Sequence, residues 1–279
     1  MHLKPEELPQ VCQLVYELCG IYLDDSKGYL IESRLGRICR DNNLGSFREL
    51  VDKVRVNRGA LRADVIDAIS THETLFFRDN SFFQAMKHKV LPELLDRKEE
   101  LGRRDIRIWS AACSTGQEAY SVAILLKELD VPANWNISIV GTDISDKAVE
   151  KARRGIYPEH ETQRGMDNSR LFRYFNKTAE GWEVGADLRR WCSFKTHNLN
   201  EGCSHMGQFD VVLCRNVLIY FDAETKRRVI GSLTRSLTEE GYLIVGGSES
   251  LVDYGPEYVA HSHCGGVFYQ PKFHRPKYV

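Results

Sequence analysis

The sequence lacks any long apolar run, and this absence argues against a membrane-spanning protein. A transmembrane helix needs about 18 or more consecutive apolar residues, and no segment of the 279 residues provides them. Residues 1–5 also lack the apolar centre of a secretory signal peptide. We therefore expect a cytoplasmic protein of about two domains, with no direct membrane insertion.

Ordered cysteine spacing is absent too. The eight cysteines form no C-x-x-C pair and no regular framework, which argues against a disulfide scaffold and a zinc ribbon. Several fall within apolar patterns and are typical of small buried residues in a reducing compartment. His261, His263 and Cys264 lie close together, but no second ligand group follows at a metal-binding spacing. We expect no metal site.

Phosphate-binding motifs are missing as well. No G-x-x-x-x-G-K loop is present, which disfavours hydrolysis of nucleoside triphosphates, and no G-x-G-x-x-G fingerprint marks a dinucleotide site. The net charge of -1 excludes a globally basic protein that seeks polyanions. Nucleic acid is therefore not an expected partner.

What is present is a strand, a loop of small residues and a helix at residues 105–126. The loop contains one glycine, Gly116. Small residues let the backbone approach a ligand, and the helix start offers free N–H groups. A tight structural turn is the alternative interpretation.

A second strand, residues 136–143, ends in Asp143. A carboxylate at this position of a nucleotide-binding βα unit accepts hydrogen bonds from ribose hydroxyls. The alternative is a helix N-cap, but Ser145 or Asp146 can serve that cap, so the ligand role is favoured.

Further strands are predicted at residues 194–199, 209–214, 241–247 and 265–270, the last one antiparallel after a turn at Gly255 and Pro256. In an open α/β sheet the ligand lies beyond the carboxyl ends of the strands. Five residues at such ends predict one shared site: Gly116, Asp143, Asn198, Arg215 and Asn216.

The N-terminal 70 residues predict four short helices, at about 6–18, 27–42, 47–54 and 61–69. Ser46 and Glu49 form a capping-box signature before the third. In the second helix Arg34, Arg37 and Arg40 lie opposite the apolar side. These three arginines, with no acid between them on that face, form either a solvated surface or a docking surface for an acidic partner.

The join at residues 71–79 carries two phenylalanines, an arginine and hydroxyl side chains, unlike a Gly- or Ser-rich spacer. We predict a segment laid across the ligand site, followed by a helix to Leu95 that Asn80 or Ser81 caps. Residues 157–196 interrupt the βα alternation, and we predict a small inserted β-hairpin unit there, after a helix that ends at Tyr157.

The chain resembles the CheR family of chemotaxis receptor methyltransferases at residues 74–78, 109–120, 143, 198–199 and 214–222. The resemblance implies an α/β fold: a Rossmann-like class I methyltransferase sheet in residues 91–279, with an inserted β-subdomain at about 157–196. It implies a helical bundle for receptor docking in residues 1–70 and a linker at 71–90 that contributes to the cofactor site.

The implied activity is transfer of a methyl group from S-adenosyl-L-methionine to glutamate carboxylates of chemoreceptors, for sensory adaptation, with S-adenosyl-L-homocysteine as the second product. Cofactor contacts are implied for Thr74, Arg78, Glu118, Asp143, Asn198, Leu199, Arg215 and Asn216. Arg34, Arg37 and Arg40 match the basic helix that meets the receptor. His72 departs from the usual Asn, and Gln117-Glu118-Ala119 from the usual Glu-Glu-Pro.

Further expectations concern partners and catalysis. The β-subdomain binds a receptor's C-terminal tail peptide in some members, and we expect a monomer recruited to receptor arrays at the inner membrane. The glutamate carboxylate is already ionised at neutral pH, so no general base is needed. We assign Arg78 and Tyr220 to orienting it, although Tyr220 could simply pack. Two alternatives stay open: a non-catalytic S-adenosylmethionine-binding module, or a methyltransferase for a small molecule or RNA.

Overall fold

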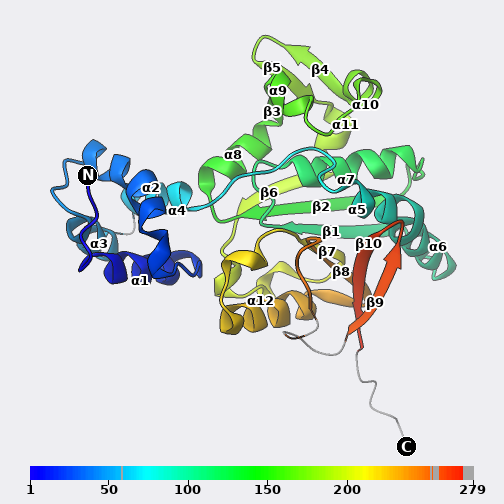
Figure 1. The fold of residues 1–279 in the computed structure, drawn as a ribbon. Coiled ribbons are helices and arrows are strands. Elements are labelled where there is room, and N and C mark those ends of the chain that lie inside the picture. Colours follow the sequence, from blue (N-terminus) through cyan, green and yellow to red (C-terminus); the bar gives the residue numbers. More distant parts are fainter. Residues whose placement is uncertain (58, 252, 254–257, 273–279) are drawn as a thin grey trace, which may run out of the picture.

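A helical bundle and a larger α/β domain make up the protein, and an extended linker joins them (Figure 1). The structure is a computed structural model that describes residues 1–279 except 58, 252, 254–257 and 273–279. The turn predicted at Gly255 and Pro256 lies outside the described residues. No helix in the described part of the chain combines the length and apolar character needed to cross a membrane.

The bundle contains the four predicted helices, α1 (Leu8–Cys19), α2 (Gly28–Asp41), α3 (Phe47–Val56) and α4 (Ala60–Ile69), with a short 3₁₀ turn η1 (Asp25–Lys27) before α2. Apolar faces of all four helices form one core. Gly20 ends α1 with a left-handed φ of 72°. The Ser46 side chain accepts a hydrogen bond from the N–H of Glu49, which confirms the predicted cap of α3.

The large sheet has seven strands in the order β6-β2-β1-β7-β8-β10-β9. Their bounds are β1 (Asp105–Ala111), β2 (Asn136–Asp143), β6 (Cys192–Thr196), β7 (Phe209–Cys214), β8 (Leu237–Val245), β9 (Tyr258–His263) and β10 (Gly266–Pro271). The first five in spatial order are parallel, whereas β10 runs antiparallel to β8 and β9, as predicted for the last strand. Strand β9 was not predicted.

Helices cover both faces of this sheet because side chains alternate along each strand. Ile106 and Ile108 of β1 belong to the core beneath α5 (Asn80–Ala85), the π-helical turn η2 (Met86–Val90), α6 (Leu91–Glu100), α7 (Gln117–Glu128) and α8 (Asp146–Arg154). Trp109 belongs to the opposite core, with α12 (Ala223–Arg235) and the 3₁₀ turns η3 (Leu199–Glu201), η4 (Ser204–Met206) and η5 (Leu218–Tyr220).

The insertion is a separate three-stranded antiparallel sheet in the order β3-β5-β4 (Figure 1). It contains β3 (Ile156–Tyr157), α9 (Glu159–Thr162), α10 (Asn168–Tyr174), β4 (Phe175–Thr178), β5 (Gly181–Val184) and α11 (Ala186–Arg189). The predicted bounds need two corrections. Helix α8 ends at the left-handed Gly155, before Tyr157, and β6 pairs with β2, so the insertion ends before Cys192.

The N-cap predicted for α8 is confirmed, whereas the one predicted for α5 is wrong. Ser145 caps α8 by accepting a hydrogen bond from the N–H of Ala148, as predicted, and this leaves Asp143 available for another role. Neither Asn80 nor Ser81 caps α5. That helix instead follows Asp79, whose φ is 65° and whose side chain makes no cap hydrogen bond, because its carboxylate pairs with Arg215.

Candidate functional site

A cleft opens at the carboxyl ends of the central strands, where the order of the sheet reverses. Strand β1 pairs with β2 on one side and with β7 on the other, and such a switch point is where open α/β sheets bind ligands. The cleft encloses about 970 Å³ of empty space, open solvent included, which suits a small-molecule site. Nine predicted site residues line it: Thr74, Arg78, Glu118, Asp143, Asn198, Leu199, Arg215, Asn216 and Tyr220.

The loop after β1 forms one wall of the cleft through Ala112, Cys113 and Ser114. Gly116 is not among the described residues that line the cleft, and the cofactor contact expected for it stays a prediction. A Cβ on Gly116 would lie 2.8 Å from the Cβ of Ala152, and its φ is 94°. Glycine is therefore required here for close packing of the loop against α8.

Asp143 lies at the end of β2 with 6% of its surface exposed. Its carboxylate accepts hydrogen bonds from the N–H of Ser114 at 2.8 Å and of Ser145 at 3.0 Å. Burial raises the pKa of this carboxyl, against the lowering effects of these N–H groups and of His72. Because each carboxylate oxygen can accept more than one hydrogen bond, Asp143 can still receive donors from a ligand in the cleft.

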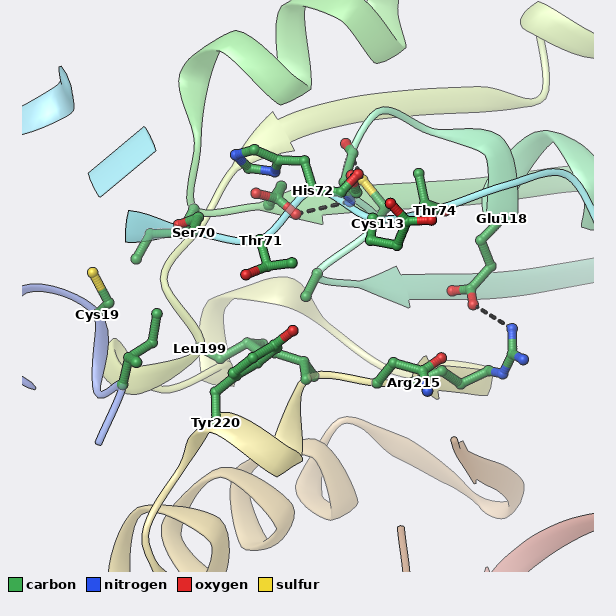
Figure 2. A pocket seen from close by; sticks show the side chains of 18 of the residues that line it. Cys19, Ser70, Thr71, His72, Thr74, Cys113, Glu118, Leu199, Arg215 and Tyr220 are labelled. Carbon is green, nitrogen blue, oxygen red and sulfur yellow. Dashed lines mark hydrogen bonds and ion pairs between the residues drawn. The ribbon is translucent and has the colours of Figure 1, made fainter. Parts of the chain in front are cut away.

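Glu118 and Arg215 also line the cleft and bind each other (Figure 2). The Arg215 guanidinium donates to Glu118 at 2.8 Å, to Asp79 at 2.6 Å and to the carbonyl oxygen of Arg78 at 2.9 Å. It also lies 3.9 Å from the ring centroid of Phe82. Glu118 and Arg215, both predicted to contact the cofactor, therefore also connect the sheet domain to the linker.

The linker crosses the open side of the cleft, as predicted, and we call residues 70–79 the strap. Seven strap residues line the cleft: Ser70, Thr71, His72, Glu73, Thr74, Leu75 and Arg78. Ser114 donates to the carbonyl oxygen of His72, and the N–H of Phe77 donates to Ser121. The ring of Phe76 contacts Tyr157 and Phe175 of the insertion. The strap is therefore anchored to both the sheet and the inserted sheet.

The helical bundle also reaches the cleft, which the sequence did not predict. Cys19 and Ile21 line it (Cys19 is labelled in Figure 2), and burial raises the pKa of Cys19 to about 12. The Asn198 amide donates to the carbonyl oxygen of Leu18 at 2.9 Å. His197, another unpredicted lining residue, has its pKa lowered by burial and by His205. No sequence pattern marked these residues, since they meet the site only through tertiary contacts.

The three arginines along α2, Arg34, Arg37 and Arg40, differ in how exposed they are. Arg37 and Arg40 are exposed, but Arg34 is half-buried. Arg34 donates to the carbonyl oxygen of Ile69 at 2.6 Å and to the hydroxyl of Thr71 in the strap. Arg37 pairs with Asp41 at 3.4 Å, just beyond the three arginines. Arg37 and Arg40 remain available to a partner.

Two sequence models of one family match almost the whole chain. The model described as "CheR methyltransferase, all-alpha domain" matches residues 6–70, and the one described as "CheR methyltransferase, SAM binding domain" matches residues 72–264. Together they cover the bundle, the strap and the sheet with its insertion.

Curated relatives show the same likeness. The chain is 39% identical to chemotaxis protein methyltransferase 1 of Pseudomonas aeruginosa over 259 residues, which are 91% of this chain and 93% of that protein. It is 37% identical to chemotaxis protein methyltransferase Cher2 of Pseudomonas putida, over 91% of this chain and 94% of that protein. It is 36% identical to chemotaxis protein methyltransferase 1 of Vibrio cholerae, over 96% and 97%.

Proposed function

Because the chain belongs to the CheR family of S-adenosylmethionine-binding chemotaxis methyltransferases, we propose that it methylates glutamate side chains in the cytoplasmic domains of chemoreceptors. The products are glutamate methyl esters and S-adenosyl-L-homocysteine. One observation carries the proposal: the strap and the carboxyl ends of β1, β2 and β7 line a single cleft.

The residues around this cleft suit the cofactor. Asp143 is an acidic acceptor at the end of β2, where it would bind the ribose hydroxyls. Thr74, Asn198, Leu199 and Asn216 line the walls beside it. Glu118 and Arg215 act differently: Glu118 pairs with Arg215, and the Arg215 guanidinium holds the strap through Asp79 and the carbonyl oxygen of Arg78. When bound, S-adenosylmethionine supplies an electrophilic methyl group on a positively charged sulfur.

The residues at the mouth of the cleft would orient the second substrate. A glutamate side chain, with a pKa of about 4.3, is ionised at neutral pH and needs no general base. Arg78 lines the cleft, and its guanidinium donates to the carbonyl oxygen of Glu73 at 2.7 Å, which leaves further donors. Arg78 and Tyr220 would align the carboxylate, and alignment alone can contribute about 7–11 kcal/mol.

Receptor binding would use surfaces outside the cleft. Arg37 and Arg40 suit the acidic methylation region of a receptor. The inserted sheet has an edge strand, β4, that could accept an extended receptor tail peptide. A cytoplasmic monomer recruited to receptor arrays at the inner membrane is part of this proposal.

The test is incubation of the purified protein with tritiated S-adenosylmethionine and bacterial membranes that contain chemoreceptors. We expect label in the receptor band that mild base releases as methanol, because carboxylate esters hydrolyse readily. Membranes without receptors, and Asp143→Ala protein, are the controls. Label that resists base, or that enters RNA or a small molecule, would overturn the substrate. Binding of cofactor without any transfer would favour the non-catalytic alternative.

A further inference from the structure

Glu249 follows β8 and holds the loop that carries Asn216 and Tyr220. One carboxylate oxygen accepts hydrogen bonds from the N–H groups of Asn216 at 2.8 Å and Gly246 at 2.7 Å. The other accepts from the N–H of Ile219 at 3.2 Å. Glu249 is not among the described residues that line the cleft. A single side chain therefore joins the turn after β8 to the loop after β7.

The loop after β7 needs such an anchor. Asn216 has a φ of 59°, a left-handed conformation that costs free energy in residues other than glycine and that asparagine tolerates best among them. The N–H of Ile219 lies in the first turn of η5, where N–H groups have no partner within the helix. A carboxylate satisfies both positions with charge-assisted hydrogen bonds, which are stronger than neutral ones.

Tyr220 follows directly in the same turn. Its N–H donates to the carbonyl oxygen of Val217 at 3.1 Å, and its carbonyl oxygen accepts from the N–H of Tyr22 at 2.9 Å. The turn is thus held from the sheet side by Glu249 and from the bundle side by Tyr22. Both attachments fix where the Tyr220 side chain enters the cleft.

We propose that Glu249 is a positioning residue for methyl transfer, which acts by fixing the backbone of residues 216–220. The catalytic part of this inference rests on the proposed function, whereas the anchoring part concerns the protein alone. Glu249 touches neither substrate, so its effect must pass through Asn216 and Tyr220.

Two substitutions disturb the anchor in different ways. Glu249→Gln keeps the size of the side chain but replaces one acceptor oxygen with an NH₂ group that faces an N–H donor. Gly246→Ala keeps the carboxylate but places a Cβ 2.8 Å from the Glu249 carboxylate and 2.9 Å from the nitrogen of Asn216. Gly247→Ala is the matched control, because a Cβ there would meet nothing within 4 Å.

The first readout is amide hydrogen exchange of residues 214–221 in the protein without cofactor, followed by mass spectrometry. Exchange should be faster in Glu249→Gln and Gly246→Ala than in the wild type, and unchanged in Gly247→Ala. The second readout is turnover. In the first two variants kcat should fall about 10- to 100-fold, as expected for a misplaced catalytic group, with a smaller change in affinity for S-adenosyl-L-homocysteine.

Several results would overturn the proposal: unchanged exchange in Glu249→Gln, unchanged kcat, a loss of cofactor affinity as large as the loss of kcat, or an equal effect of Gly247→Ala. If Glu249→Gln does not fold, Gly246→Ala, which retains the carboxylate, decides the question. If the wild type forms no base-labile ester, the proposed function fails, while the exchange comparison still decides whether Glu249 anchors the loop.

Discussion

The guanidinium of Arg215 donates to the carboxylate of Glu118 across 2.8 Å, and the two side chains are only 2% and 14% exposed. The same guanidinium reaches Asp79 in the strap at 2.6 Å. One buried cation therefore connects the end of β7, the first turn of α7 and the strap.

Removing one partner of this pair should destabilise the protein. In Glu118→Gln, Arg215 keeps Asp79 but loses a buried charged acceptor, and we expect the free energy of unfolding to fall by about 1–3 kcal/mol. Urea denaturation measures this. Asp64→Asn is the control, because its ion pair with Lys147 is exposed and should contribute less than about 1 kcal/mol. Equal losses of unfolding free energy in Glu118→Gln and Asp64→Asn would show that the buried ion pair contributes no more to stability than the exposed one.

Arg78→Ala should separate catalysis from cofactor binding. We expect kcat for receptor methylation to fall about 100-fold, as for the loss of a donor that orients a reacting group, with little change in the Kd for S-adenosyl-L-homocysteine. Arg164→Ala is the control, since Arg164 pairs with Glu73 in the same strap but is exposed. Equal losses of turnover and of cofactor affinity would refute this division of roles.

The affinity for S-adenosyl-L-homocysteine should depend on the charge of Asp143. Because burial raises the pKa of Asp143, its carboxylate becomes protonated at a higher pH than an exposed aspartate, whose pKa is about 3.9. Calorimetric affinity should therefore be full at neutral pH and decline on acidification through the raised pKa.

The comparison that isolates Asp143 uses Asp143→Asn, which removes the charge of this side chain and changes no other residue. We expect this variant to bind about 1–3 kcal/mol more weakly at neutral pH and to lose most of the decline with acid. A variant that binds as tightly as the wild type, or that retains the full decline, would exclude the carboxylate as the ribose acceptor.

Charge reversal of Arg37 and Arg40 to Glu should slow receptor methylation and leave the Kd for S-adenosyl-L-homocysteine unchanged, because both side chains are exposed on α2. We expect the receptor KM to rise about tenfold or more, and to rise less at high salt. Arg48→Glu, on the exposed surface of α3, controls for net charge. Unchanged receptor KM would identify Arg37 and Arg40 as solvated surface.

Arg34 should behave differently from the other two arginines. Its hydrogen bonds to Ile69 and Thr71 tie α2 to the strap. The sequence placed all three arginines on one face from helical spacing alone, and it could not show that the first one turns toward a neighbouring segment.

The sheet, the bundle and the convergence of the candidate residues on one cleft could be predicted from local patterns in the sequence. Continuous apolar strands, the Ser46 cap and the polar residues at strand ends are all local patterns, and parallel strands bring such ends together. Residues of the strap line this cleft, and its phenylalanines and arginine are residues that pack and form hydrogen bonds, unlike those of a flexible spacer.

Other features depended on contacts that the sequence does not display. Gly116 packs against α8, Asp79 pairs with a residue 136 positions away, and Cys19 reaches the cleft only because α1 ends against Asn198. The end of the insertion was misplaced because β6 begins at Cys192, whereas the sequence pattern marked this strand only from residue 194.

The most direct test is a crystal structure of the protein with S-adenosyl-L-homocysteine. The account predicts that the ribose hydroxyls bind the carboxylate of Asp143, beneath the strap, and that the sulfur faces the side on which Arg78 and Tyr220 lie. A ligand seated elsewhere, such as the cleft between α4 and His205, would contradict it.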